Sequence, residues 1–148
     1  MFGRNKKQVK AFSDAIDNAL EEFWQTSNET LRTEIFLAYI EMASISIFLA
    51  RRTLGTNRVG DFAEHFRKMI LKKYNDDYNI RFDALMMDYA ANLVNANEVE
   101  CFSFAAHRLI GRFYDTKDTK EDEETIATCF VRLATELQPR LLSIMSEY

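Results

Sequence analysis

Proline and glycine are scarce in this chain, which has one proline and four glycines in 148 residues. A sheet protein needs turn residues roughly every 8–12 positions, so this composition argues against a sheet and favours an all-helical fold. Only two cysteines are present, and their spacing matches neither a disulfide framework nor a zinc site. A low cysteine content is typical of a reducing compartment, and we therefore expect a cytoplasmic protein.

Long hydrophobic runs and an excess of basic charge are also missing. The most apolar stretch, residues 35–50, is shorter than the roughly 20 residues that span a bilayer and contains Glu41, so we expect no transmembrane segment. The basic start MFGRNKK lacks the apolar core of a secretory signal. The net charge is −4 and the pI is near 5.3. The net charge therefore provides no overall electrostatic attraction to nucleic acid, and we expect nucleic acid not to be the partner.

Apolar residues, in contrast, are plentiful. They make up 47% of the chain and include twelve phenylalanines, while charged residues make up 28%. This balance is typical of a globular protein and not of a disordered one. A chain of this length suits one domain with a sizeable core, and no internal repeat or long linker divides it. Residues 1–148 are therefore predicted to form a single helical domain.

Residues 35–50 are apolar on almost every side of a helix. At the helical period, two neighbouring apolar stripes run along this stretch. The first contains Ile35, Ala38, Met42, Ile45 and Leu49, and the second contains Phe36, Ile40, Ala43, Ile47 and Ala50. Such a helix must be covered nearly all round. We predict an all-α bundle of about six helices packed around a long central helix at residues 29–54.

Apolar residues at steps of three and four predict the other helices. These helices cover about residues 7–25, 61–75, 82–95 and 99–113 and the stripe 126–144. Gly55 is expected to end the central helix in the left-handed conformation, residues 55–60 to form a loop, and Asp61 to cap the third helix. Pro139 is expected to kink the last helix or to split off its last two turns. The short connections predict that the third, fourth and fifth helices are antiparallel neighbours.

Residues 51–73 form a basic cluster that contains seven lysine or arginine residues and only two acidic residues. One interpretation is a site for phosphate, nucleic acid or acidic lipid. Its candidate anion-binding residues are Arg58, His65, Lys68 and Lys72. The interpretation that we favour is structural, because four of the seven cations fall in the last turns of two helices, where the helix dipole favours positive charge.

Glu41 is the one carboxylate in the most apolar stretch, residues 35–50. A buried carboxylate needs a partner or has a raised pKa, and strongly perturbed groups are candidate catalytic residues. We favour an ion pair with an arginine or lysine from another helix over catalysis. A third hypothesis makes Glu41 the polar anchor of an interior pocket for a small apolar ligand. The other pocket candidates are Tyr39, Met42, Phe48 and Met86.

The residues that could support chemistry do not form a recognisable constellation. Neither His65 nor His107 has the Glu-x-x-His spacing of helical di-iron sites, and two histidines cannot complete a three-histidine zinc site. Cys129 and His107 fall at the same level of a predicted hairpin, but Cys129 belongs to an apolar stripe, where buried thiols are inert. We therefore expect no enzymatic activity, no metal and no cofactor.

The function that we favour from sequence is a small interaction or regulatory protein that acts through protein–protein contact. Its partner is another protein or a second copy of the chain, since aromatic and methionine residues exceed what single core stripes require. A homodimer through the central helix or through off-stripe aromatics such as Phe48 and Phe104 is the first form to test. The alternatives are the bundle that binds an apolar ligand and the protein that binds an anionic partner through residues 51–73.

Overall fold

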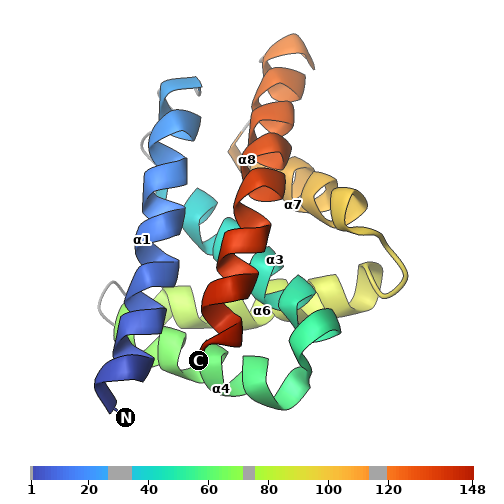
Figure 1. Cartoon of the computed structure of the whole chain (residues 1–148). Helices are drawn as coiled ribbons and strands as arrows, with labels where there is room; N and C mark the ends of the chain where they lie inside the picture. Colours follow the sequence, from blue (N-terminus) through green and yellow to red (C-terminus); the bar gives the residue numbers. More distant parts are fainter. Residues whose placement is uncertain (1, 27–34, 72–75, 114–119) are drawn as a thin grey trace.

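The computed structural model describes residues 2–26, 35–71, 76–113 and 120–148, and in these ranges every regular element is helical (Figure 1). The predicted all-α fold is confirmed. The elements are α1 (Phe2–Thr26), α3 (Ile35–Leu54), α4 (Thr56–Phe66), the π-helical turn η1 (Arg67–Leu71), α6 (Asp76–Asn92), α7 (Glu98–Phe113) and α8 (Lys120–Ser146). None of the helices in these ranges is both long and apolar enough to cross a membrane.

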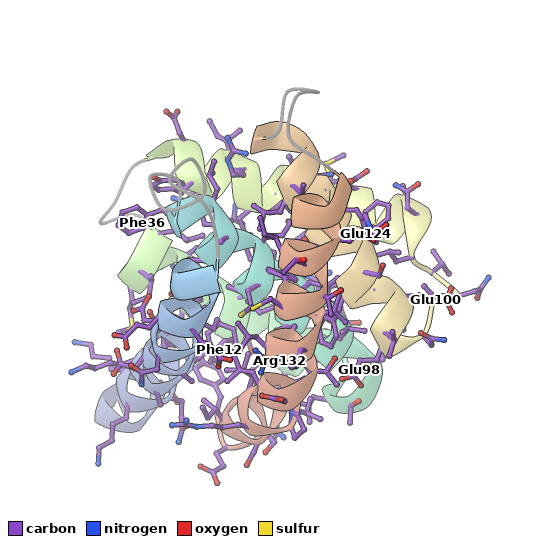
Figure 2. All side chains as sticks on the ribbon, turned by 90° about the horizontal axis from the view of Figure 1, so that it is seen from above. Phe12, Phe36, Glu98, Glu100, Glu124 and Arg132 are labelled. Carbon is purple, nitrogen blue, oxygen red and sulfur yellow. The ribbon has the colours of Figure 1, made fainter. Side chains whose placement is uncertain are left out.

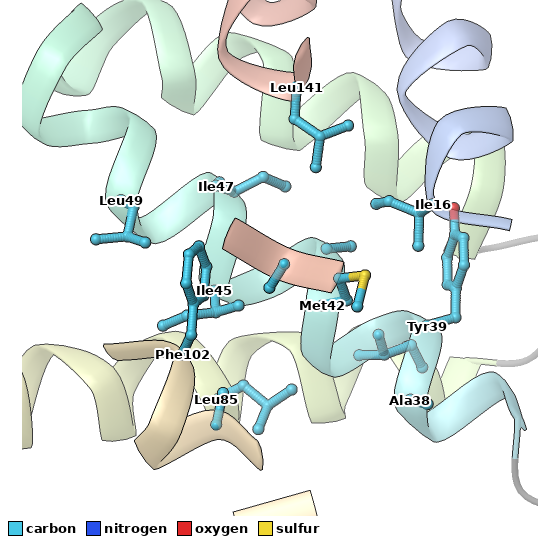
Figure 3. Close-up of a cluster of buried hydrophobic side chains, with 14 of the residues drawn as sticks. Ile16, Ala38, Tyr39, Met42, Ile45, Ile47, Leu49, Leu85, Phe102 and Leu141 are labelled. Carbon is cyan, nitrogen blue, oxygen red and sulfur yellow. The ribbon is translucent and has the colours of Figure 1, made fainter. Parts of the chain in front are cut away.

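Helix α3 is the centre of the protein, as its sequence predicts. Every residue from 38 to 47 is buried, and the helix packs on α1, α4, α6, α7 and α8. Figure 3 shows side chains from these neighbours, such as Ile16 of α1 and Phe102 of α7, around the α3 residues Met42 and Ile45. The predicted start of this helix at residue 29 lies outside the described residues.

The other helices surround α3 without forming a simple series of hairpins. Helices α1 and α8 lie side by side (Figure 1), and α7 packs on both α8 and α3. Helix α6 packs mainly on α3. The sequence predicts that the third, fourth and fifth helices are antiparallel neighbours, and consecutive ones are in contact: η1 packs on α6, and Asp88 of α6 pairs with Arg108 of α7. All of them also pack on or beside α3, with which α6 and α7 make more extensive contacts than with one another.

One residue, Gly55, connects α3 to α4. Its φ of 88° is positive, as expected for the glycine that ends α3, although its ψ of 154° differs from that of the left-handed helix. Its N–H donates a 3.1 Å hydrogen bond to the carbonyl of Arg51. The predicted loop at residues 55–60 and the predicted cap at Asp61 are wrong, since α4 already begins at Thr56. Burial of Val59 in the core accounts for the earlier start.

The remaining helix ends agree with the sequence in part. A tight reversal precedes α7, where Asn97 and Glu100 form a capping box: the Glu100 N–H donates to Asn97 Oδ1 at 2.8 Å. Helix α8 continues without interruption through Pro139, so the predicted splitting of its last two turns is wrong. Contacts beyond the proline hold these turns in the helix, because Leu141 and Met145 are completely buried. Residues 114–119, which follow the predicted fifth helix, lie outside the described ranges.

Candidate functional sites

A polar network that includes Glu41 joins three helices. Glu41 of α3 is only 3% exposed and accepts a 2.5 Å hydrogen bond from the hydroxyl of Tyr89 on α6. Its other carboxylate oxygen lies 3.5 Å from Nε of Arg108 on α7, an ion pair without hydrogen-bond geometry. Arg108 also pairs with Asp88 of α6. The predicted ion pair of Glu41 with a cation from another helix is confirmed.

Burial and charge keep Tyr89 a hydrogen-bond donor. Burial raises the pKa of the Tyr89 hydroxyl well above its usual 10.0, and the negative charge of Glu41 raises it further. The adjoining cavity, lined by Glu41, Arg81 and Arg108 among others, has a volume of only about 10 Å³. That volume is close to the lower limit for one water molecule, so an organic ligand does not fit beside this carboxylate.

The other pocket candidates lie on different sides of α3. Tyr39 faces α1, where its hydroxyl is 2.6 Å from the Ser13 hydroxyl, and Met42 is completely buried. Phe48 instead packs against Tyr89, with ring centroids 5.6 Å apart. Met86 is buried in α6. The structure thus distributes these residues through the core and does not gather them around Glu41.

Two of the anion-binding candidates contact the end of α8. Arg58 donates a 3.1 Å hydrogen bond to the carbonyl of Ser146, one of the last carbonyls of that helix. His65 is within hydrogen-bond distance of the Tyr148 hydroxyl. Both side chains therefore hold the C-terminal turn of α8 against α4, which supports the structural interpretation of the basic cluster.

Two further cations of the basic cluster, Arg67 and Lys68, also have acidic partners. The exposed Lys68 lies 3.8 Å from Glu64, one helical turn earlier, and Lys72 lies outside the described residues. Arg67, which the sequence analysis did not single out, pairs with Asp83 of α6 at 2.5 Å. These contacts reduce the positive charge that an anionic partner would meet on this side of the protein.

The histidine and the cysteines considered for chemistry have separate environments. His107 is exposed, and its Nδ1 donates a 2.7 Å hydrogen bond to the carbonyl of Ser103, because a carbonyl can only accept. Cys129 is buried, and so is Cys101, whose pKa is raised by burial. Within the described residues, no group of three or more histidine, cysteine, aspartate or glutamate side chains is arranged to hold a metal ion.

Helix α6 is apolar on its outer side as well as on its inner side. Its inner stripe, predicted from sequence, is buried and consists of Phe82, Leu85, Met86, Tyr89 and Leu93. On the outer side, Ile80, Met87 and the following Val94 are 68%, 74% and 68% exposed. Ala84 and Ala91 are exposed between them. We call these five residues the outer stripe of α6.

The outer stripe has the spacing of a helix–helix contact. Its residues follow one another at steps of four and three, so the four that belong to α6 lie on one line along the helix, and Val94 follows in the turn after it. This stripe was not predicted from the sequence. The apolar residues at steps of three and four are visible in the sequence. Because α6 has two such apolar stripes, however, the sequence alone does not show which of them faces solvent.

A second surface feature is a groove between α7 and α8. Its volume is about 470 Å³, and we call it the α7–α8 groove. The lining residues are Val99, Ser103 and His107 of α7 and Glu124, Ala127, Thr128, Val131 and Arg132 of α8. The sequence analysis did not identify this groove, because its residues come from two helices and lie beside the core stripes of both.

Comparisons of this chain with family models, curated proteins and solved structures gave no match. The function is therefore argued from the outer stripe and the network described above.

Proposed function

We propose that this protein is a helical interaction protein that acts as a homodimer, with the outer stripe of α6 as its contact surface. The observation behind this proposal is the high exposure of Ile80 and Met87 along one line of α6 and of Val94 in the turn that follows it. Single exposed apolar side chains are ordinary, but an apolar line at seven-residue spacing is the pattern of helices that pack on one another.

The order of large and small residues along the stripe suits a second copy of the same helix. In an antiparallel pair related by a two-fold axis, Ile80 meets Ala91 of the second copy and Met87 meets Ala84 of the second copy. The symmetry repeats both contacts, so each large side chain packs against a small one. A parallel pair would place Met87 against Met87 and leave the alanines facing each other. The residue order therefore favours the antiparallel arrangement.

Charge along one side of the stripe agrees with this arrangement. Arg81 and Asp88 are seven residues apart and lie on the same flank of the stripe. The two-fold axis of the antiparallel pair brings Arg81 close to Asp88 of the second copy, where it adds to the pair that Asp88 makes with Arg108 of its own chain. One helix pair is a small interface, and we therefore expect a dimer with a dissociation constant in the micromolar range.

The central helix and the aromatic residues proposed from sequence are less suited to this contact. Residues 38–47 of α3 are already covered within one chain. Phe48 and Phe104 both pack against Tyr89, with ring centroids 5.6 and 6.3 Å from its ring. Binding of an apolar ligand or of an anionic partner also has weaker support, because Glu41, Arg58 and Arg67 are occupied by internal contacts.

Sedimentation velocity over a range of concentrations tests the proposal. We expect the wild type to dimerise with increasing concentration and Met87→Glu to remain monomeric, because the two-fold axis places the new carboxylates close together. Val99→Glu, a change of another exposed apolar residue that lies outside the stripe, is the matched control and should dimerise normally. A wild type that stays monomeric at high micromolar concentration would overturn the proposal, as would dimerisation of Met87→Glu.

Cysteine cross-linking tests the orientation. Ala84→Cys mixed with Met87→Cys should give a disulfide between the two variants, whereas each variant alone should cross-link poorly. Efficient cross-linking of each variant with itself would indicate a parallel pair. The native cysteines are buried and should contribute little.

A further inference from the structure

We propose that the α7–α8 groove binds a basic, amphipathic helix from a different protein. This inference goes beyond the dimer, because the groove is lined by α7 and α8 and contains no residue of α6. The occupant follows from three features of the groove, which are its length, the size of the side chains along it, and the charge around it.

The α7 side of the groove has the length of about two helical turns. Its α7 residues Val99, Ser103 and His107 follow one another at steps of four and so lie along one face of the helix. The distance from Val99 to His107 corresponds to about 12 Å of helix rise. A groove between two packed helices accommodates a third helix, whose side chains fill the space between the two ridges.

The middle of the groove is lined by small side chains. Ser103 of α7 faces Ala127 and Thr128 of α8 there, while Val99 and Val131 supply apolar surface. Small residues allow the backbone of a bound helix to come close, and the valines give its apolar side chains a surface to cover. This combination is typical of a groove that recognises the apolar face of an amphipathic helix.

Negative charge surrounds this apolar surface. Figure 2 shows Glu98 and Glu100 at the N-terminal end of α7 and Glu124 on α8. All three carboxylates are exposed. The one arginine that lines the groove, Arg132, is already paired with Glu22 at 2.5 Å and with Glu136 at 3.6 Å.

Carboxylates therefore outnumber cations around the groove. A bound helix with lysine or arginine beside its apolar face would place these cations next to Glu98 at one end and Glu124 at the other. An acidic helix would be repelled at the same positions. Charge complementarity thus favours a basic partner. It also orients the bound helix, with its apolar face in the groove and its basic side chains beside the carboxylates.

Selection from a displayed library of helical peptides tests this inference. The library should have fixed alanine and leucine residues on one face and equal proportions of lysine and glutamate at the flanking positions. The bait should be the Met87→Glu variant, so that dimerisation does not interfere. We expect lysine-rich peptides to be enriched and to bind with an affinity that decreases as salt increases.

A pair of variants locates the binding site. Thr128→Arg places bulk and positive charge in the groove and should weaken binding of the selected lysine-rich peptide by about tenfold or more. Thr53→Arg makes the same change at an exposed position in the last turn of α3 and should leave binding unchanged. Circular dichroism of both variants would verify that they are folded.

Three outcomes would overturn the inference. They are the absence of any enriched peptide, enrichment of glutamate-rich peptides, and binding that Thr128→Arg does not weaken. Because the bait is a monomeric variant, each of these outcomes leaves the proposed dimer of α6 untouched, and a failure of the dimer leaves the groove proposal intact.

Discussion

The hydroxyl of Tyr89 on α6 donates a 2.5 Å hydrogen bond to the buried carboxylate of Glu41 on α3. Glu41 is also the residue that Arg108 of α7 approaches. One carboxylate thus links three helices in the centre of the protein. Since a buried charge is tolerated only with partners, this network helps to specify which helices pack together.

Removal of the charge at this position should destabilise the fold. Glu41→Gln leaves Arg108 paired with Asp88 alone and weakens the hydrogen bond from Tyr89, and we expect the free energy of unfolding to fall by about 1–3 kcal/mol. Tyr89→Phe deletes one hydrogen bond and should lower it by about 1–2 kcal/mol. Urea denaturation followed by circular dichroism measures both changes. Glu147→Gln, at an exposed position, is the control; wild-type stability in Glu41→Gln would disprove a structural role for the network.

Because the pKa of Tyr89 is raised, we expect the stability of the fold to decrease in alkaline solution. An unfolded chain releases the tyrosine proton near pH 10, whereas the folded protein retains it to higher pH because burial and Glu41 raise the pKa. Stability from the protonated hydroxyl is therefore complete below pH 10 and is lost as the pH rises toward the folded-state pKa. Urea denaturation at pH 9 and at about pH 11 should show a smaller loss in Tyr89→Phe than in the wild type. Equal losses in the two proteins would contradict this assignment.

Substitution by alanine should have opposite effects on stability at Gly55 and at Gly60. Gly55 has a φ of 88°, so Gly55→Ala forces an unfavourable backbone conformation and should lower the free energy of unfolding by about 1–2 kcal/mol. Gly60 lies within α4 with open space around its Cα, so Gly60→Ala should raise it by about 0.5–1 kcal/mol. Thermal or urea unfolding of the two variants gives the comparison. Stabilisation by both substitutions would show that the positive φ of Gly55 is not required.

Pro139 should be a source of instability within α8. The residue is exposed, and its ring removes one backbone hydrogen bond from the interior of the helix. Pro139→Ala restores that bond and should raise the free energy of unfolding by about 1–3 kcal/mol. Arg140→Ala, at the next exposed position, should change it by less than about 0.5 kcal/mol. Loss of stability in Pro139→Ala would mean that packing of the last two turns depends on the proline.

The sequence was sufficient to predict the class of the fold and the position of its core. Residues 35–50 are apolar on nearly every side, and a helix with this composition has to lie at the centre of the protein. The inner stripe of α6 was also predictable, because its residues recur at the helical period. The start of α4 was not, since the two glycines at positions 55 and 60 suggested a loop and only contacts with the core favour a helix there.

The sequence by itself determined that this chain is helical, that one helix is enclosed by the others, and that Glu41 needs a partner. These conclusions depend on side-chain chemistry and on the period of the helix, which are local properties. The tertiary structure decided that the partner is Arg108, that Ile80 and Met87 remain exposed, and that α7 and α8 border a groove. Such relationships depend on which faces of distant helices meet, and local periodicity does not contain that information.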